Sequence, residues 1–116
     1  MAVDVSVDRT YAVDTQDVFL SLTIGEGQFG VSDVRLGSQT LVRASGPINV
    51  RVGKGTDIAG QTLVVTSVIN DVNTHTNRMS VSYRLTGGKA PAAFVGSGDC
   101  PSEGGVLVFQ ANISLQ

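Results

Sequence analysis

Charge is scarce in this chain. Only 16% of its 116 residues are Asp, Glu, Lys or Arg, whereas soluble domains usually carry roughly 25%. The ten acidic and eight basic residues leave a formal net charge of −2, and the basic residues are scattered along the chain. Because nucleic-acid binding depends on clustered Lys and Arg side chains, the sequence predicts no nucleic-acid partner. A surface with so little charge is either solvated by hydroxyl groups or covered by another chain, which favours a homo-oligomer.

Long apolar runs are also missing. No segment approaches the roughly 20 apolar residues that a membrane-spanning helix needs, so we expect no membrane span. The first residues, Met1-Ala2-Val3-Asp4-Val5, lack the basic region and the apolar stretch of a secretory signal. For the chain as written we therefore expect a cytoplasmic location. A mature fragment, or export by a non-classical route, would change that expectation.

Residues with reactive side chains are few. The single cysteine, Cys100, cannot form a disulfide within the chain, and its glycine-rich surroundings show no cation that would activate the thiol. His75 is the only histidine, and no Gly-x-Ser-x-Gly segment accompanies it. Catalysis therefore ranks below binding or assembly, and we expect a protein that is not an enzyme. The only cofactor for which the sequence offers an argument is calcium.

What the chain has in abundance is the alternation typical of β-strands. Between residues 78 and 86 the apolar side chains fall on every second position without an error. The last strand-like segment also alternates, except that Val106 and Val108 are apolar on its outward parity. Period-two alternation marks a strand with one buried face. The expected core includes Met79, Val81, Tyr83, Leu85, Leu107, Phe109, Ala111 and Ile113.

Short strands separated by Gly, Pro, Asn and Asp predict one all-β domain over residues 1–116. The fold expected is a two-sheet antiparallel β-sandwich, immunoglobulin-like or jelly-roll-like, with seven to eight strands. No window shows helical spacing over three turns, so we expect no helix longer than two turns. Apolar residues change parity between Val31 and Val34, which suggests a bulge or a bend there. The run around Val64 is apolar on both parities and should be a central or doubly covered strand.

A glycine-rich segment, Gly25-Glu26-Gly27-Gln28-Phe29-Gly30, matches the pattern G-x-G-x-x-G. A dinucleotide site needs a helix directly after this pattern, so that the helix N-terminus meets the pyrophosphate. The residues that follow are strand-like instead. We interpret the segment as a glycine-rich hairpin.

The polar loop at residues 71–77 is the best candidate for a ligand site. Asp71, Asn73, His75 and Asn77 could bind a ligand, and the oxygens of Asp71, Asn73 and Asn77 could hold calcium. The spacing departs from an EF-hand, because Thr76 stands where that loop needs glycine and Ser82 where it needs glutamate. Turn formation alone also explains Asn and Asp at these positions, and we favour that explanation.

Three apolar residues lie on the outward parity of otherwise alternating strands: Phe19, Val106 and Val108. An apolar side chain at such a position is explained if another chain or a loop covers it. We therefore expect a non-catalytic binding or assembly module that self-associates through these residues. The alternative is a lectin-like module that binds carbohydrate through the 71–77 loop, with or without calcium. The sequence resembles no family that would decide between the two hypotheses.

Overall fold

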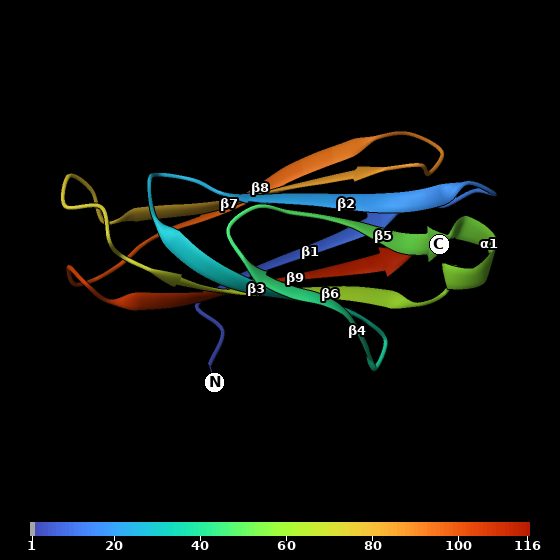
Figure 1. The fold of residues 1–116 in the computed structure, drawn as a ribbon. Coiled ribbons are helices and arrows are strands. Elements are labelled where there is room, and N and C mark those ends of the chain that lie inside the picture. Colours follow the sequence, from blue (N-terminus) through green and yellow to red (C-terminus); the bar gives the residue numbers. More distant parts are fainter. Residues whose placement is uncertain (1) are drawn as a thin grey trace.

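The fold was analysed in a computed structural model, which describes residues 2–116. These residues form nine strands and one helix of four residues (Figure 1). The elements are β1 (Val5–Tyr11), β2 (Asp17–Ile24), β3 (Phe29–Leu36), β4 (Gln39–Ser45), β5 (Ile48–Lys54), α1 (Gly55–Ile58), β6 (Thr62–Asn70), β7 (Arg78–Thr86), β8 (Ala92–Asp99) and β9 (Val106–Leu115). The expected β-sandwich is confirmed, with more strands than the seven to eight predicted. No helix within residues 2–116 is long and apolar enough to cross a membrane.

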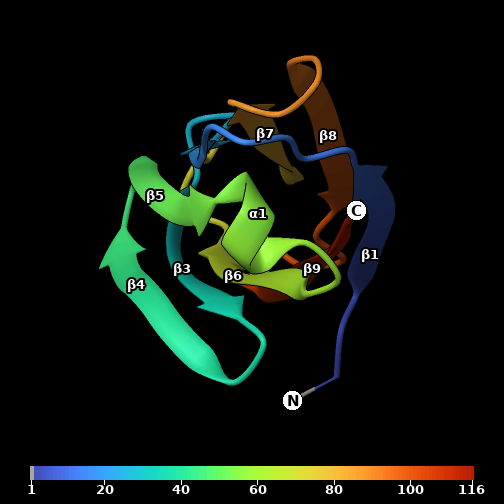
Figure 2. The same cartoon turned by 90° about the vertical axis from the view of Figure 1, so that its right-hand side faces the viewer.

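The strands form two sheets that pack face to face. One sheet has five strands in the order β1-β9-β6-β3-β4, and the other has four in the order β5-β2-β7-β8. Figure 1 shows them as a lower and an upper layer, and Figure 2 shows the same layers end-on. All neighbours pair antiparallel except β1 and β9, which are parallel. The purely antiparallel sandwich that we predicted is therefore wrong at this one pair.

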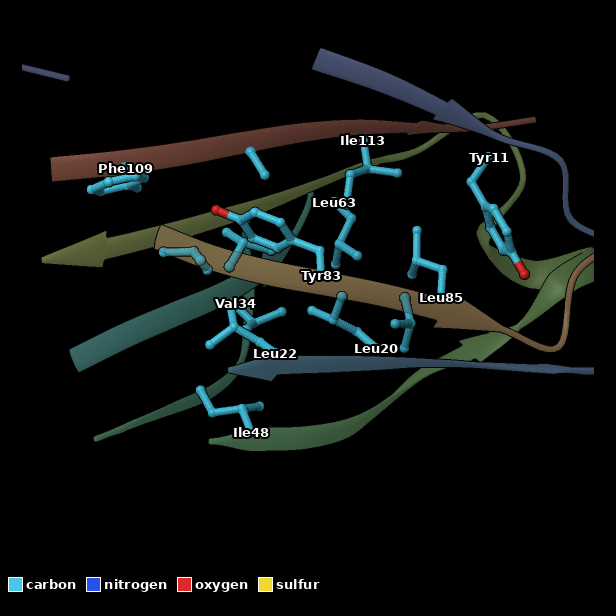
Figure 3. Packing of buried hydrophobic residues seen from close by; sticks show 14 of the residues in the cluster. Tyr11, Leu20, Leu22, Val34, Ile48, Leu63, Tyr83, Leu85, Phe109 and Ile113 are labelled. Carbon is cyan, nitrogen blue, oxygen red and sulfur yellow. The ribbon is translucent and has the colours of Figure 1, made fainter. Parts of the chain in front are cut away.

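The core lies between the sheets and is made by the inward parity of each strand. All eight predicted core residues are buried. In Figure 3, Leu20, Tyr83 and Leu85 of the four-stranded sheet point towards Leu63 and Ile113 of the five-stranded sheet. The alternation identified them because only one face of each strand is removed from water.

The parity change in β3 has a different cause from the one predicted. β3 pairs with β6 in unbroken register from Phe29 to Leu36, so β3 contains no bulge. The register shift lies in the pairing of β3 with β4, where Leu41 has no direct partner. The inward positions of β3 simply include a polar residue, Ser32. Its hydroxyl is fully buried and bonds the Ser67 hydroxyl at 2.7 Å, which offsets the cost of burying both.

All connections between consecutive strands except β3–β4 and β7–β8 carry the chain from one sheet to the other, and two of these crossing loops follow β2 and β6. β2 lies in the four-stranded sheet and β3 in the five-stranded sheet, so the glycine-rich segment is a crossing loop and not the hairpin predicted. The strand around Val64 is β6, which is the central strand of five, as expected. The crossing loops after β2 and β6 lie at the same end of the sandwich, which brings together segments far apart in the sequence (Figure 1).

One side of the sandwich is closed by β1 against β8. A Cβ atom on Gly96 would lie 3.1 Å from Val7 Cγ2, and one on Gly98 would lie 3.0 Å from Val5 Cγ2. The Arg9 guanidinium lies 5.3 Å from the ring centroid of Phe94, a cation–π distance. The broad outer faces of the two sheets remain open, and the molecule measures 45 × 25 × 21 Å.

Candidate functional site

The 71–77 loop is organised by Gln28, which the sequence analysis did not single out. Its Oε1 accepts the backbone N–H groups of Val72 and Asn73 at 2.8 and 2.9 Å. Its Nε2 donates to the carbonyl oxygens of Thr76 and Arg78 at 3.1 and 3.0 Å. One side chain from the β2–β3 connection thus holds both ends of the loop between β6 and β7. Four bonds to one nearly buried amide make this loop an ordered structure.

Asn73, a predicted ligand, already bonds the protein through both side-chain atoms. Its Oδ1 accepts the His75 N–H at 3.0 Å, and its Nδ2 donates to the Glu26 carbonyl at 2.8 Å. The first bond is an Asx turn, the structure that we favoured over a metal site. His75 and Asn77 are exposed, and the Asn77 carbonyl accepts the Cys100 N–H at 2.8 Å. Four residues close in sequence therefore do not present four free ligand groups.

Asp71 is different from the other three predicted ligands because it is buried. Only 5% of its surface is exposed, and neither carboxylate oxygen has a hydrogen-bond partner among residues 2–116. Its backbone N–H donates to the Gly105 carbonyl at 2.9 Å. A buried carboxylate without a partner costs free energy unless a proton, a water or a cation satisfies it. Within residues 2–116, no three His, Cys, Asp or Glu side chains are grouped to hold a metal ion.

Cys100 lies beside this loop and is also buried. Its Sγ donates to the Ser102 carbonyl at 3.2 Å, and only 4% of the residue is exposed. The thiol is therefore packed within the β8–β9 connection, as a structural cysteine would be.

The three predicted interface residues do not share one surface. Phe19 is 42% exposed and lies on the outer face of the four-stranded sheet, whereas Val106, 47% exposed, lies on the outer face of the five-stranded sheet. Val108 has the predicted outward parity but is only 5% exposed. Asp4, just before β1, bonds the backbone N–H and carbonyl of Val108, both at 2.8 Å. One contact through all three residues is excluded by this geometry.

The outer face of the four-stranded sheet is made of small hydroxyl-bearing and apolar side chains. Phe19 projects from β2, and β8 adds Val95, which is 56% exposed. Between them lies a hollow of about 440 Å³. The outward residues that line it are Ser21, Thr23, Ser82, Arg84, Ala93 and Val95. The sequence analysis missed Ala93 and Val95, although their neighbours Phe94 and Gly96 on the inward parity of β8 could have indicated them.

This face also carries little net charge. Asp17 and Arg51, at its β5 edge, form an ion pair with 2.8 Å between Oδ1 and Nη2. The hydrogen bond from Arg51 lowers the pKa of Asp17, so both groups are ionised and neutralise each other near neutral pH. Among the residues that line the hollow, Arg84 is the only charged one in the described chain. The face therefore combines a protruding phenyl ring with an adjacent hollow in which Arg84 is the one charged side chain among the described residues.

Comparisons with protein-family models, with curated proteins and with solved structures found no match to this chain.

Proposed function

We propose that this protein is a non-catalytic assembly module whose copies associate through the outer face of the four-stranded sheet. The observation that carries the proposal is the pairing of an exposed phenyl ring with a neighbouring hollow on one face. Phe19 is two residues before Ser21, which lines the hollow, so ring and hollow are roughly 7 Å apart along the strand. A surface with both features can pair with a second copy of itself.

A two-fold arrangement satisfies both copies at once. Each copy inserts Phe19 into the hollow of the other, which is the self-complementary pattern of isologous dimers. The hollow of about 440 Å³ is larger than a phenyl ring, and its walls are mainly apolar or hydroxyl-bearing. Arg84 in the hollow would lie near the incoming ring, where a guanidinium is favourable.

Charge and area agree with such a contact. Asp17 and Arg51 can enter the contact as a neutral pair, and Arg84 is the one charged side chain that lines the hollow in the described chain. Each partner in a standard interface buries roughly 800 Å². The broad faces of a molecule that measures 45 × 25 × 21 Å can supply that area.

The experiment compares two phenylalanine variants by light scattering at micromolar concentrations. Phe19→Ser removes a ring that is 42% exposed from the four-stranded sheet, and Phe29→Ser removes a ring that is 51% exposed from the five-stranded sheet. We expect Phe19→Ser to weaken association at least tenfold while Phe29→Ser leaves this contact intact. Ser82→Arg, which fills the hollow, should act like Phe19→Ser. Equal masses for the wild type and Phe19→Ser would refute the proposal.

A second candidate function, cation-dependent ligand binding of the lectin type, is favoured by one observation. The two carboxylate oxygens of Asp71 are buried without a partner in the described chain, at the loop end of the sandwich. Calcium prefers oxygen ligands, and a carbohydrate could then complete its coordination. Asn77 is exposed and close in sequence, whereas the Asn73 oxygen is already used by His75.

Thermal unfolding with and without millimolar calcium tests this candidate. A ligand that binds only the folded protein at a hundredfold excess over its Kd stabilises it by roughly 2.7 kcal/mol. We expect any such shift to disappear in Asp71→Asn and to persist in Asp99→Asn, an exposed control on β8. An unchanged melting temperature would assign these residues to loop formation, and retention on a sugar matrix would then be tested without calcium.

A further inference from the structure

The outer face of the five-stranded sheet has features that the proposed contact does not use. A hollow of about 660 Å³ runs over it, with Val64, Thr66 and Val68 of the central strand β6 among its lining residues. Beside this hollow, in the same register row of the sheet, Phe29 and Val106 are 51% and 47% exposed. Figure 2 shows the β3–β4 hairpin and the segment before β1 below this sheet, on either side of β6 and β9.

We propose that this face binds a second copy of the chain around a two-fold axis that runs along β6. The strand order β1-β9-β6-β3-β4 has β6 at its centre. A rotation about β6 therefore places β3 opposite the partner's β9, and β4 opposite the partner's β1. Positions along the strands are unchanged by this rotation, so residues in one register row meet residues in the same row.

The apolar side chains are complementary under this rotation. Phe29 pairs with Asn70, and Asn70 pairs with Val106, so the three form one row across the sheet. Rotation about β6 puts Phe29 of one copy opposite Val106 of the partner subunit, and the reverse contact forms at the same time. Two exposed apolar side chains that have no cover within residues 2–116 are then removed from water.

The charges are complementary as well. The β3–β4 half of the face carries Arg35 and Arg43, and the β1 edge carries Asp4 and Asp8. All four residues are exposed. Asp33, the one carboxylate on this half, lies 2.7 Å from Arg35 Nε and directly across from Arg43 in the register, and Arg43 makes no ion pair within the described chain. Under the rotation, Arg43 lies between the carboxylates of Asp4 and Asp8 of the partner subunit.

The alternative two-fold axis, which runs across the strands, is unfavourable because of the same distribution of charges. It would place each β1 edge opposite the partner's β1 edge, so that aspartates face aspartates and arginines face arginines. Like charges in contact across an interface disfavour it, which selects the axis along β6.

The test uses charge-reversed variants in a Phe19→Ser background, which removes the contact proposed for the other sheet. Asp8→Arg puts like charges opposite the partner's Arg43, and Arg43→Asp puts them opposite the partner's Asp8. Each variant alone should be monomeric under conditions where the Phe19→Ser parent is a dimer. An equimolar mixture should restore a dimer, and native mass spectrometry should identify it as one chain of each kind. Both substitutions are at exposed positions, and circular dichroism of each variant checks that the fold is kept.

The outcomes separate this inference from the proposed function. A monomeric Phe19→Ser parent, or a mixture that stays monomeric, overturns the inference about the five-stranded sheet. Dimers of Asp8→Arg alone, as stable as those of the parent, overturn it too. A Phe19→Ser protein that associates as strongly as the wild type refutes the proposed function and leaves this test valid. Rescue only in the mixture supports the axis along β6.

Discussion

At the scale of single residues, the buried hydroxyl groups differ in whether they have a hydrogen-bond partner. Tyr83 is 1% exposed and stacks on Phe94 with ring centroids 5.0 Å apart, but its hydroxyl has no hydrogen-bond partner in the described chain. Burial raises the pKa of this hydroxyl well above its ordinary value. Ser32 and Ser67, equally buried, bond each other. The same apolar environment thus holds one satisfied pair and one unsatisfied group.

Tyr83→Phe should leave the free energy of unfolding unchanged or raise it, because a buried hydroxyl without a partner costs roughly 1–3 kcal/mol. The effect depends on pH. Since the folded pKa is raised, Tyr83 stays protonated in the folded protein, whereas an unfolded tyrosine ionises near about pH 10. The ionisation of Tyr83 therefore leaves the free energy of unfolding unaffected below about pH 10. Above that pH it lowers the free energy of unfolding progressively, because only the unfolded state loses the proton. Urea unfolding from pH 8 to 11 should show a smaller alkaline loss in Tyr83→Phe than in the wild type.

The Ser32–Ser67 pair predicts a strongly non-additive double-mutant cycle. Ser32→Ala leaves the Ser67 hydroxyl buried without its 2.7 Å partner, which should cost roughly 1–3 kcal/mol, and Ser67→Ala should cost about the same. The double variant should be close to the wild type, because neither hydroxyl then remains unsatisfied. Additive losses in urea unfolding would show that the hydroxyls do not depend on each other.

At the scale of elements, glycines in the loops share a left-handed backbone but differ in how closely other segments pack against them. Gly87, after β7, has φ +90°, and a Cβ atom there would collide with the Asp17 carbonyl. Gly60, before β6, has φ +87° but has nothing within 4 Å of such an atom in the described chain. The two positions share a left-handed backbone and differ only in packing, which makes them a matched pair.

Gly60→Ala should lower the free energy of unfolding by about 1–2 kcal/mol, the cost of a left-handed backbone with a side chain. Gly87→Ala should lose a further 1–3 kcal/mol or so, because β2 must move to make room. Chemical denaturation of both variants measures the difference. Equal losses would mean that the β7–β8 connection shifts freely, so that its contact with β2 does not restrain it.

At the scale of the whole molecule, two self-complementary faces on opposite sides of one sandwich have a consequence for assembly. Each face binds one neighbouring copy and leaves the opposite face free. Copies can therefore add to one another in an open row and not only in pairs. We expect the wild type to exceed a dimer as concentration rises, and either single-face variant to stop at a dimer. Phe19→Ser combined with Asp8→Arg should be a monomer of 12.0 kDa.

Salt should weaken association through one face more than association through the other. Raising the ionic strength from about 0.1 to 1 M shortens the Debye length from about 10 to 3 Å. Association through the five-stranded sheet depends on Arg43, Asp4 and Asp8, so dimers of Phe19→Ser should weaken. Association through the apolar and hydroxyl-bearing face around Phe19 should persist in Asp8→Arg. Light scattering at the two ionic strengths distinguishes this result from a uniform response of both variants.

Several features of the fold and site followed from the sequence because they are local. Alternation in β7 and β9 identified eight core residues, and the Asx turn at Asn73 follows from turn chemistry. Parity also placed Phe19 and Val106 at the surface, but it could not show that Val108 is covered. The segment that bonds the Val108 backbone includes Asp4, which is 104 positions away in the sequence.

By itself, the sequence determined that the chain is all-β, where most strands lie and which face of each is apolar. These properties arise from side chains two positions apart on one extended backbone. Only the tertiary structure decided that β2 and β3 belong to different sheets, that β1 runs parallel to β9, and that Gln28 holds the 71–77 loop. It also separated Phe19 from Val106. Each of these outcomes rests on contacts between distant segments, whose free energies depend on how the strands pair, and strand pairing is not encoded by any local period.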